Sequence, residues 1–137
     1  MGDYSFCDIV AGDAPAVGVY EDETTLAFLD IAPVAAGHTL VVPKRHRETL
    51  TDMDAGTTAE VFGTARRVAG AIGAALEPDG LNLVQANGEA AGQEVFHAHV
   101  HLLPRQADDD ARVRWPAGDL EAGAEVAASI RAALPAE

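Results

Sequence analysis

The stretch that decides how this chain folds and what it can do is His97-Ala98-His99-Val100-His101-Leu102-Leu103. Side chains along a β-strand point alternately to its two faces, so the three histidines share one face. The apolar residues Phe96, Ala98, Val100 and Leu102 share the other face and are expected to pack on a core. We therefore predict a strand over residues 95–103, ended by Pro104, that carries a histidine row (His97, His99 and His101) opposite an apolar surface.

Further strands are predicted at residues 17–20, 24–30, 38–42 and 81–86, where apolar and β-branched residues lie between turn-forming Gly, Pro and acidic residues. Helices are predicted at residues 6–11, 57–76 and 119–134. Two of the connections between strands are short enough for hairpins, which favours antiparallel pairing. The expected fold is α+β, with a five-stranded, mainly antiparallel sheet, one long helix and a C-terminal helix.

The long helix shows apolar residues at helical spacing, and these are expected to face the core. They are Val61, Phe62, Ala65, Val68, Ala69, Ile72 and Leu76. Thr57 and Glu60 have the spacing of a capping box at its start. Asp119 is the expected N-cap of the C-terminal helix.

Length and composition limit the class of protein. A chain of 137 residues, 48% of them apolar, predicts a single folded domain. No apolar run is long enough for a membrane span, and residues 1–6 lack the features of a secretory signal. The single cysteine, Cys7, excludes an internal disulfide and indicates a reducing compartment, so a cytoplasmic location is expected.

The charge is strongly negative, with 22 acidic residues, 9 basic residues and a net charge of −13. Such a surface repels phosphate backbones, so we expect no nucleic-acid partner. Many acidic and small residues with a single lysine, Lys44, also favour a halophilic host, whose salt would screen the repulsion. We expect the folded circular dichroism signal to be lost on dialysis to low salt, and an unchanged signal would contradict this.

Two chemistries explain a histidine row. Neutral imidazoles ligate zinc and other metals, and a catalytic zinc needs three protein ligands and an open position. Alternatively, an imidazole nitrogen attacks phosphorus and forms a phosphoramidate, while neighbouring groups stabilise the phosphate oxygens. The glycine-rich loop at residues 87–94 favours the second chemistry, because glycines let backbone N–H groups approach an anion. An ordinary β-turn loop would look the same.

These residues resemble the histidine triad family. The row matches its pattern of three alternating histidines separated by apolar residues, and three other stretches match in the right order: residues 27–33, 37–44 and 92–96. The resemblance covers about residues 4–105, within one expected domain of residues 1–137 that carries a C-terminal helical extension over about 106–137.

The resemblance implies a role for each matching residue. His99 would attack the α-phosphorus, oriented by the backbone carbonyl of His97. His101 would contact the phosphate or leaving group, and His38 and His97 would complete the polar shell. Asp30 would bind the ribose hydroxyls. The base pocket would be lined by Phe6, Ile9, Phe28 and Ile31, and the phosphate would be held by Asn87, Gly92, Gln93 and the backbone N–H of Val95. Without the resemblance, Phe28 and Ile31 are equally well explained as core and Asp30 as a turn residue.

The implied function is a nucleotide hydrolase or transferase that releases a nucleoside monophosphate from a purine nucleoside phosphoramidate or dinucleoside polyphosphate. It would need no cofactor and act as a homodimer with the two sheets side by side. The alternatives are a metal-dependent hydrolase that uses the histidine row as ligands, and a nucleotide-binding regulatory protein with little turnover. In this family the C-terminal region lies near the site, so Trp115 is either a ligand contact or a packing residue.

Two departures from the family pattern stand out. Glu94 occupies a position where some branches carry a Ser or Thr that assists the leaving group. Several bacterial-type members also carry a Cys-x-x-Cys pair that binds structural zinc with histidines. The corresponding residues here are Tyr4 and Cys7, and His46 is interpreted as a surface residue, so no metal is predicted.

Overall fold

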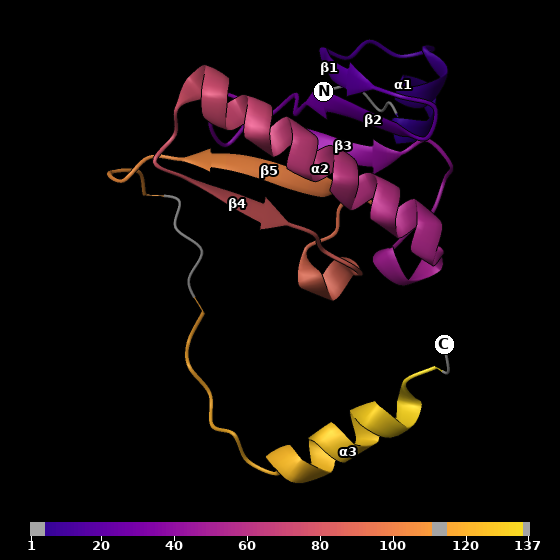
Figure 1. Cartoon of the computed structure of the whole chain (residues 1–137), viewed down its shortest axis with the longest axis vertical. Helices are drawn as coiled ribbons and strands as arrows, with labels where there is room; N and C mark the ends of the chain where they lie inside the picture. Colours follow the sequence, from indigo (N-terminus) through magenta and orange to yellow (C-terminus); the bar gives the residue numbers. More distant parts are fainter. Residues whose placement is uncertain (1–4, 111–114, 136–137) are drawn as a thin grey trace.

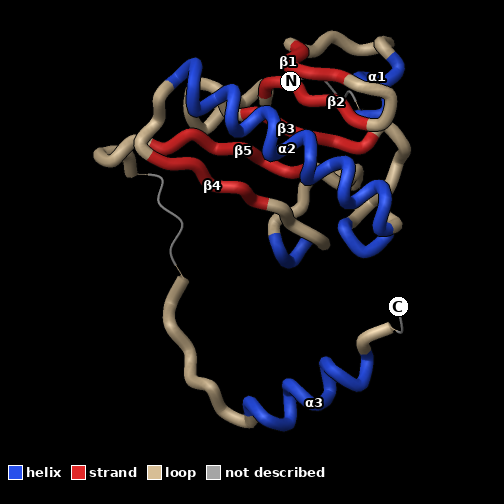
Figure 2. Tube along the Cα trace, in the orientation of Figure 1, coloured by secondary structure: helices blue, strands red, loops and turns tan. Residues whose placement is uncertain are grey.

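The computed structural model of the protein describes residues 5–110 and 115–135 (Figures 1 and 2). In chain order the regular elements are α1 (Phe6–Ala11), β1 (Gly18–Glu21), β2 (Thr25–Leu29), β3 (Thr39–Pro43), the 3-10 turn η1 (Leu50–Asp52), α2 (Ala55–Leu76), β4 (Gly80–Val84), the 3-10 turn η2 (Glu89–Ala91), β5 (Val100–Arg105) and α3 (Gly123–Ala133). Residues 5–110 are called the body below, and residues 115–135 the C-terminal arm.

The five strands form one sheet in the order β1-β2-β3-β5-β4, and each neighbouring pair is antiparallel. The chain therefore has the predicted α+β fold. Tight connections join β1 to β2, whereas α2 carries the chain across the sheet between β3 and the edge strand β4 (Figure 1). β5 then enters between β3 and β4, which places His101 of the histidine row in the interior of the sheet.

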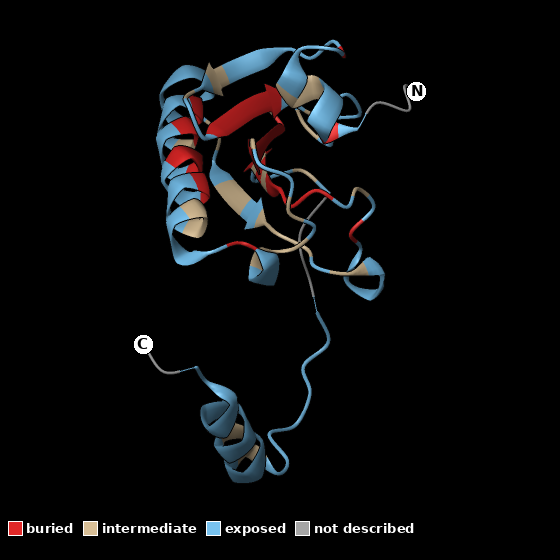
Figure 3. Ribbon diagram, turned by 90° about the vertical axis from the view of Figure 1, so that its right-hand side faces the viewer, coloured by how far each residue is buried: buried red, intermediate tan, exposed pale blue. Residues whose placement is uncertain are grey.

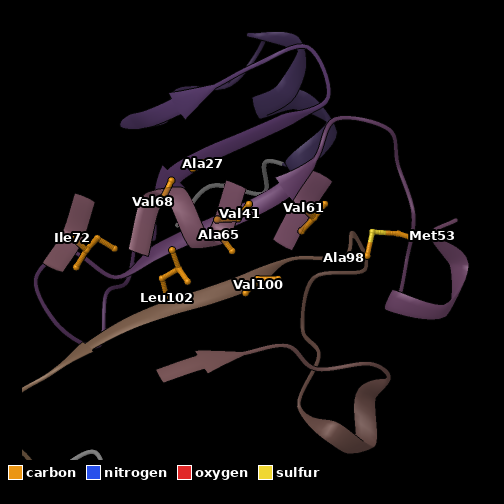
Figure 4. Packing of buried hydrophobic residues seen from close by; sticks show 10 residues of the cluster. All are labelled: Ala27, Val41, Met53, Val61, Ala65, Val68, Ile72, Ala98, Val100 and Leu102. Carbon is orange, nitrogen blue, oxygen red and sulfur yellow. The ribbon is translucent and has the colours of Figure 1, made fainter. Parts of the chain in front are cut away.

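The main core lies between α2 and one face of the sheet (Figure 4). Sheet residues of this core are Ala27, Val41, Ala98, Val100 and Leu102, and α2 contributes Val61, Ala65, Val68 and Ile72. The predicted helix face is partly wrong, because Phe62 and Leu76 are exposed and Ala69 is only half-buried. Phe62 and Ala69 lie about 100° and about 80° round the helix from Val61, on the flank of the buried stripe, and Leu76 is the last residue of α2.

A second apolar cluster covers the opposite face of β2 and β3 under α1. Its buried members are Phe6, Leu26, Phe28, Leu40 and Val42. Ser5 caps α1 by accepting a hydrogen bond from the backbone N–H of Asp8, and Gly12 ends it with a positive φ of 82°. The short helix is thus fixed at both ends over the face that also carries the histidine row.

Two helix starts differ from prediction. α2 begins at Ala55 and is capped by Asp54, whose carboxylate accepts a 2.7 Å hydrogen bond from the N–H of Thr57. The carboxylate is a good cap and precedes the expected Thr57–Glu60 capping box, so the helix starts earlier. α3 begins at Gly123 instead of Asp119, and no side chain caps it.

The strand carrying the histidine row is also displaced from the prediction. β5 starts only at Val100 and continues through the buried Pro104 to Arg105. Pro104 is tolerated because β3 pairs only as far as Leu102, so the missing N–H lies where one neighbouring strand has already ended. Pro43 is likewise the last residue of β3, whereas the prediction ended that strand at Val42.

The C-terminal arm stands apart from the body. α3 contains no buried residue, and Figures 1 and 3 show it at a distance from the sheet, on the side where β4 is the outermost strand. Within the described residues, no helix is both long and apolar enough to cross a membrane.

Candidate active site

The histidine row lies on the sheet face that α1 partly covers. His101 is in β5, paired with Leu40, and Leu40 belongs to the cluster under α1. His97 and His99 precede β5 in an irregular segment, yet the alternation continues, because Ala98 is in the core on the α2 side. Phe96 breaks the predicted apolar face: its side chain is 43% exposed, since the chain has not yet reached the sheet there.

His99 is held in one orientation by its own chain. Its Nδ1 lies 2.7 Å from the backbone carbonyl oxygen of His97, and a carbonyl can only accept, so Nδ1 carries the proton. The neutral ring therefore has its lone pair on Nε2. The Phe6 ring packs edge-on against the imidazole at 5.2 Å between centroids.

The second ring nitrogen of His99, Nε2, is open. Among the described residues, Nε2 makes no hydrogen bond, and every fully buried side-chain nitrogen or oxygen has a partner. Nε2 is therefore accessible, although the residue as a whole is only 9% exposed. Burial lowers the pKa of His99 below its ordinary value of 6.5, so the ring stays neutral near neutral pH.

The tautomers of His38 and His101 also follow from the hydrogen bonds that these two residues make. The N–H of Val34 donates to Nδ1 of His38 at 3.1 Å, so the proton of neutral His38 is on Nε2. Nε2 of His38 lies 2.9 Å from Nδ1 of His101 and 3.4 Å from a carboxylate oxygen of Asp30. Donation from His38 to His101 leaves the proton of His101 on Nε2.

The pKa of His101 is strongly lowered. Burial, and then the nearby imidazoles of His99 and His38, lower the pKa of His101 to about 4. Burial also lowers the pKa of His38. At neutral pH the site therefore contains uncharged rings, with the acceptor of His99 beside the N–H donor of His101; the ring centroids of these two are 4.9 Å apart.

The side chain of His97 points elsewhere. Its Nε2–H donates to the Pro43 carbonyl oxygen at 2.7 Å, and its Nδ1 lies 3.7 Å from the sulfur of Cys7. Cys7 also lies 3.3 Å from Nδ1 of His46. Only the backbone carbonyl of His97 takes part in orienting His99, so the three imidazoles of the row have three separate environments.

One set of donors suitable for a metal ion consists of Cys7, His46 and His97, whose ligand atoms lie within 4.8 Å of one another. The contact of His46 with Cys7 was not foreseen, because 39 residues separate them and His46 is exposed. A closed structural zinc site takes four ligands. Among the described residues this cluster supplies three, and the expected fourth position, Tyr4, lies outside them.

The histidine row does not act as a single metal-binding group. Among the described residues, a second possible donor set is Asp30, His38 and His101, but no set contains two members of the row, and His99 is in neither. The arrangement therefore gives no support to a hydrolase that uses the three histidines as ligands of one ion.

The glycine-rich loop is held in place by hydrogen bonds of the side-chain amides of Gln93 and Asn87. The side-chain N–H₂ of Gln93 donates to the carbonyls of Glu48 at 2.6 Å and Val95 at 3.1 Å, and its oxygen accepts from the N–H of Gly88. Asn87 accepts from the N–H of Leu50 at 2.7 Å.

The fold of this loop leaves backbone N–H groups open at its end, at Glu94 and the following Val95. Gly88 and Gly92 have positive φ values of 91° and 95°, which makes the tight course of the loop possible. The N–H groups of Ala91, Gly92 and Gln93 are used inside the loop. The N–H of Val95 has no partner among the described residues.

The residues predicted to line a base pocket fall into two groups. Phe6 and Phe28 are buried in the cluster under α1 and Ile9 packs against it, whereas Ile31 is 77% exposed in the loop after Asp30.

A cavity of about 460 Å³ lies between residues 34–36 and 104–110, and its lining contains no histidine.

Comparisons with known proteins agree with this arrangement. The HIT domain family model matches residues 11–108. The chain is 49% identical over 105 residues to Protein hit of Bacillus subtilis, covering 77% of this chain and 72% of that protein. It is 39% identical over 112 residues to adenosine 5'-monophosphoramidase hnt1 of Schizosaccharomyces pombe, covering 81% of each.

A solved structure matches over nearly the whole length. The crystal structure of a HIT family member from Bacillus subtilis has a TM-score of 0.91 at 40% identity, covering 99% of this chain and 100% of that chain. The family model matches well over half of the residues, including the whole histidine row and His38. The chain therefore belongs to the HIT-domain family.

Proposed function

We propose that this protein is a nucleotide hydrolase or transferase that cleaves at the α-phosphorus of a nucleoside phosphoramidate or dinucleoside polyphosphate and releases a nucleoside monophosphate. The observation that carries the proposal is the accessible, unprotonated Nε2 of His99, fixed by the bond from Nδ1–H to the His97 carbonyl. The name of the Schizosaccharomyces pombe relative, an adenosine 5'-monophosphoramidase, supports the substrate class.

In the first step, the lone pair of His99 Nε2 attacks the α-phosphorus. A P–N bond to His99 forms while the bond from phosphorus to the leaving group breaks. As positive charge develops on the imidazole, the His97 carbonyl stabilises the N–H of Nδ1. The departing amine or phosphate takes its electron pair with it, and an amine also takes up a proton from solvent water.

His101 is placed to assist this departure. Its Nε2–H is a neutral donor that faces the same side of the sheet as His99, and His38 fixes its tautomer through the 2.9 Å hydrogen bond. A donor at that position stabilises charge on the phosphate oxygens or the leaving atom. In the second step, water attacks the nucleotidyl-His99, breaks the P–N bond and releases the monophosphate with the imidazole restored.

The nucleotide would lie between Asp30 and the glycine-rich loop. Asp30 is partly accessible and its carboxylate can accept from ribose hydroxyls, while the exposed apolar side chain of Ile31 follows it in the same loop. The N–H of Val95 would bind a phosphate oxygen. Asn87 and Gln93 would contribute by fixing this loop, since their amides already bond to the body.

The proposed assembly is a homodimer joined through β4. This strand pairs only with β5 and forms an edge of the sheet, where unpaired backbone groups favour addition of another strand. Exposed apolar side chains occur on β4 and on α2: Leu83 on β4 is 48% exposed, and Phe62 and Leu76 on α2 are 37% and 48% exposed.

The test is release of AMP from an adenosine phosphoramidate in the presence of a chelator, with a His99→Ala variant as control. We expect release by the wild type that resists the chelator and is lost in the variant. Loss of wild-type activity with chelator, restored by a divalent ion, would instead indicate a metal-dependent hydrolase. AMP binding by the wild type without release would indicate a regulatory binding protein.

A further inference from the structure

The end of the glycine-rich loop carries a carboxylate beside the backbone donors proposed to bind phosphate. Glu94 is exposed, and among the described residues its side chain has no hydrogen-bond or ion-pair partner. The open N–H of Val95 belongs to the peptide unit that begins at the Glu94 Cα, so that nitrogen lies about 2.5 Å from this Cα. A phosphate held by the N–H would therefore lie within about 10 Å of the Glu94 carboxylate in any rotamer of the side chain.

The backbone around Glu94 is held on both sides. The side chain of Gln93 is buried, donates to the carbonyls of Glu48 and Val95, and accepts from the N–H of Gly88. The side chain of Val95 packs against the apolar cluster under α1. The carboxylate of Glu94 therefore stays near the open N–H groups of the loop.

The charged side chains in the segments that form the site all have the same sign. Residues 30–38 and 87–101 contain the site histidines and the polar residues proposed to hold the nucleotide. These two segments include three carboxylates, Asp30, Glu89 and Glu94, and no lysine or arginine. Burial lowers the pKa of all four of their histidines below 6.5, so the imidazoles add no positive charge at neutral pH.

The basic residues in the segment that follows β3 act on other groups. Lys44 forms an ion pair with a carboxylate of β1, and the guanidinium of Arg47 donates to the carbonyl of its own neighbour. The hydrogen bonds from Thr57, and then the charges of Arg47 and Arg45, lower the pKa of Asp54 at the start of α2. Among the described residues, no cationic side chain forms an ion pair or hydrogen bond with the two segments of the site.

We propose that Glu94 determines leaving-group specificity by its charge, favouring an amine that carries a second, protonated amino group and disfavouring a phosphate leaving group. The inference rests on the function proposed above and chooses between its two substrate classes. The α-phosphate itself can be held by the open N–H groups and the donor of His101. A polyphosphate leaving group brings further negative charges near the carboxylate, whereas an ammonium group on the leaving amine is attracted to it.

The test compares three adenosine substrates whose leaving groups differ in charge. They are a phosphoramidate of a linear diamine, a phosphoramidate of the alkylamine of equal length, and diadenosine tetraphosphate. For the wild type at low ionic strength, we expect kcat/KM to be about tenfold higher for the diamine substrate than for the alkylamine substrate. Because exposed charges are screened by salt, this preference should shrink as the salt concentration rises.

The variant Glu94→Gln removes the charge and keeps the size of the side chain. Its preference for the diamine should fall below about twofold, and its kcat/KM for diadenosine tetraphosphate should rise about tenfold relative to that for the alkylamine substrate. Glu94→Asp keeps the charge and should keep the preference. These ratios do not depend on the fraction of folded enzyme, so a partly unfolded variant still gives a result.

Glu60→Gln is the matched control. It removes the same charge from an exposed position on α2, across the sheet from the histidine row, and should leave both ratios within about twofold of wild type. Unchanged ratios in Glu94→Gln, or an equal loss on all three substrates, would overturn the proposal. Equal wild-type rates on the two phosphoramidates would overturn this inference alone, whereas no AMP release from any of the three would overturn the proposed function as well.

Discussion

The two faces of β5 divide the work of the molecule. On one face, Val100 and Leu102 are buried against α2 in a hydrophobic core. On the other face, His99 and His101 keep one ring nitrogen bonded and one available, although their pKa values are lowered by burial. Alternation along a single strand therefore separates residues that stabilise the fold from the residues that we propose react. Substitutions on the two faces should have different consequences.

The largest expected effect is on the reactive face. Replacing His99 by Asn keeps an N–H where Nδ1–H donates to the His97 carbonyl, but removes the nucleophilic Nε2. We expect AMP release to fall about 10⁴-fold or more, with the free energy of unfolding changed by less than about 1 kcal/mol. Rates from stopped assays and urea unfolding measure the two quantities.

The variant His99→Ala sharpens this result. It should lose the same activity but also leave the buried carbonyl without its donor, at a cost of about 1–3 kcal/mol. Substantial AMP release by either variant would contradict the assignment of His99 as nucleophile.

On the core face the expected loss is in stability. Leu102 is fully buried, so Leu102→Ala should lower the free energy of unfolding by about 2–5 kcal/mol. Activity per folded molecule should stay within about threefold of wild type, because no reacting group is touched. Val19→Ala, at a residue 44% exposed on β1, is the control and should cost less than about 1 kcal/mol. A tenfold loss of activity per folded Leu102→Ala molecule would show that the two faces are coupled.

The pH dependence follows from the lowered pKa values. The lone pair of His99 exists only in the neutral ring, and its folded-state pKa lies below 6.5. Activity should therefore hold on going from pH 8 to 6.5 and fall only at lower pH. A decline that begins above pH 7 in a plot of log kcat/KM would contradict the neutral site.

The free energy of unfolding should also decrease as pH falls. The unfolded histidines bind protons near pH 6.5, while the folded ones, with lower pKa values, resist protonation. Their contribution is complete above pH 6.5 and is lost as pH falls through the folded-state values. Urea unfolding at several pH values measures this loss.

The smallest expected effect concerns metal. Cys7, His46 and His97 supply three donors, one fewer than a closed zinc site. We expect dialysis against a chelator to leave less than stoichiometric zinc and to shift Tm by no more than about 2 °C. A stoichiometric, chelator-resistant zinc in the pure protein would contradict the prediction, and Cys7→Ser would show whether this cluster holds it.

Much of this organisation could be predicted from the sequence, because alternation in a strand is a local property. The histidine row, the core partners Val100 and Leu102, and the five strands follow from patterns a few residues long. The fold class is confirmed by the sheet, and the family by the matching model.

Long-range partners could not be predicted in this way. The contact between Cys7 and His46 depends on how α1 packs on the sheet, and the hydrogen bond from His97 to Pro43 depends on where β3 ends. Phe62 matched the helical pattern, yet it is exposed because it lies about 100° round α2 from Val61, on the flank of the buried stripe. The roles of Asp30, Ile31 and Val95 toward a nucleotide stay predictions.

The central claim is that His99 becomes covalently linked to the nucleotidyl group, and the stereochemical course at the α-phosphorus tests it most directly. An adenosine phosphoramidate made chiral at phosphorus with sulfur would be hydrolysed in ¹⁸O-water, and the configuration of the product determined. Attack by His99 followed by attack by water inverts the phosphorus twice, so the account predicts overall retention. Overall inversion would show that water attacks phosphorus directly and would contradict it.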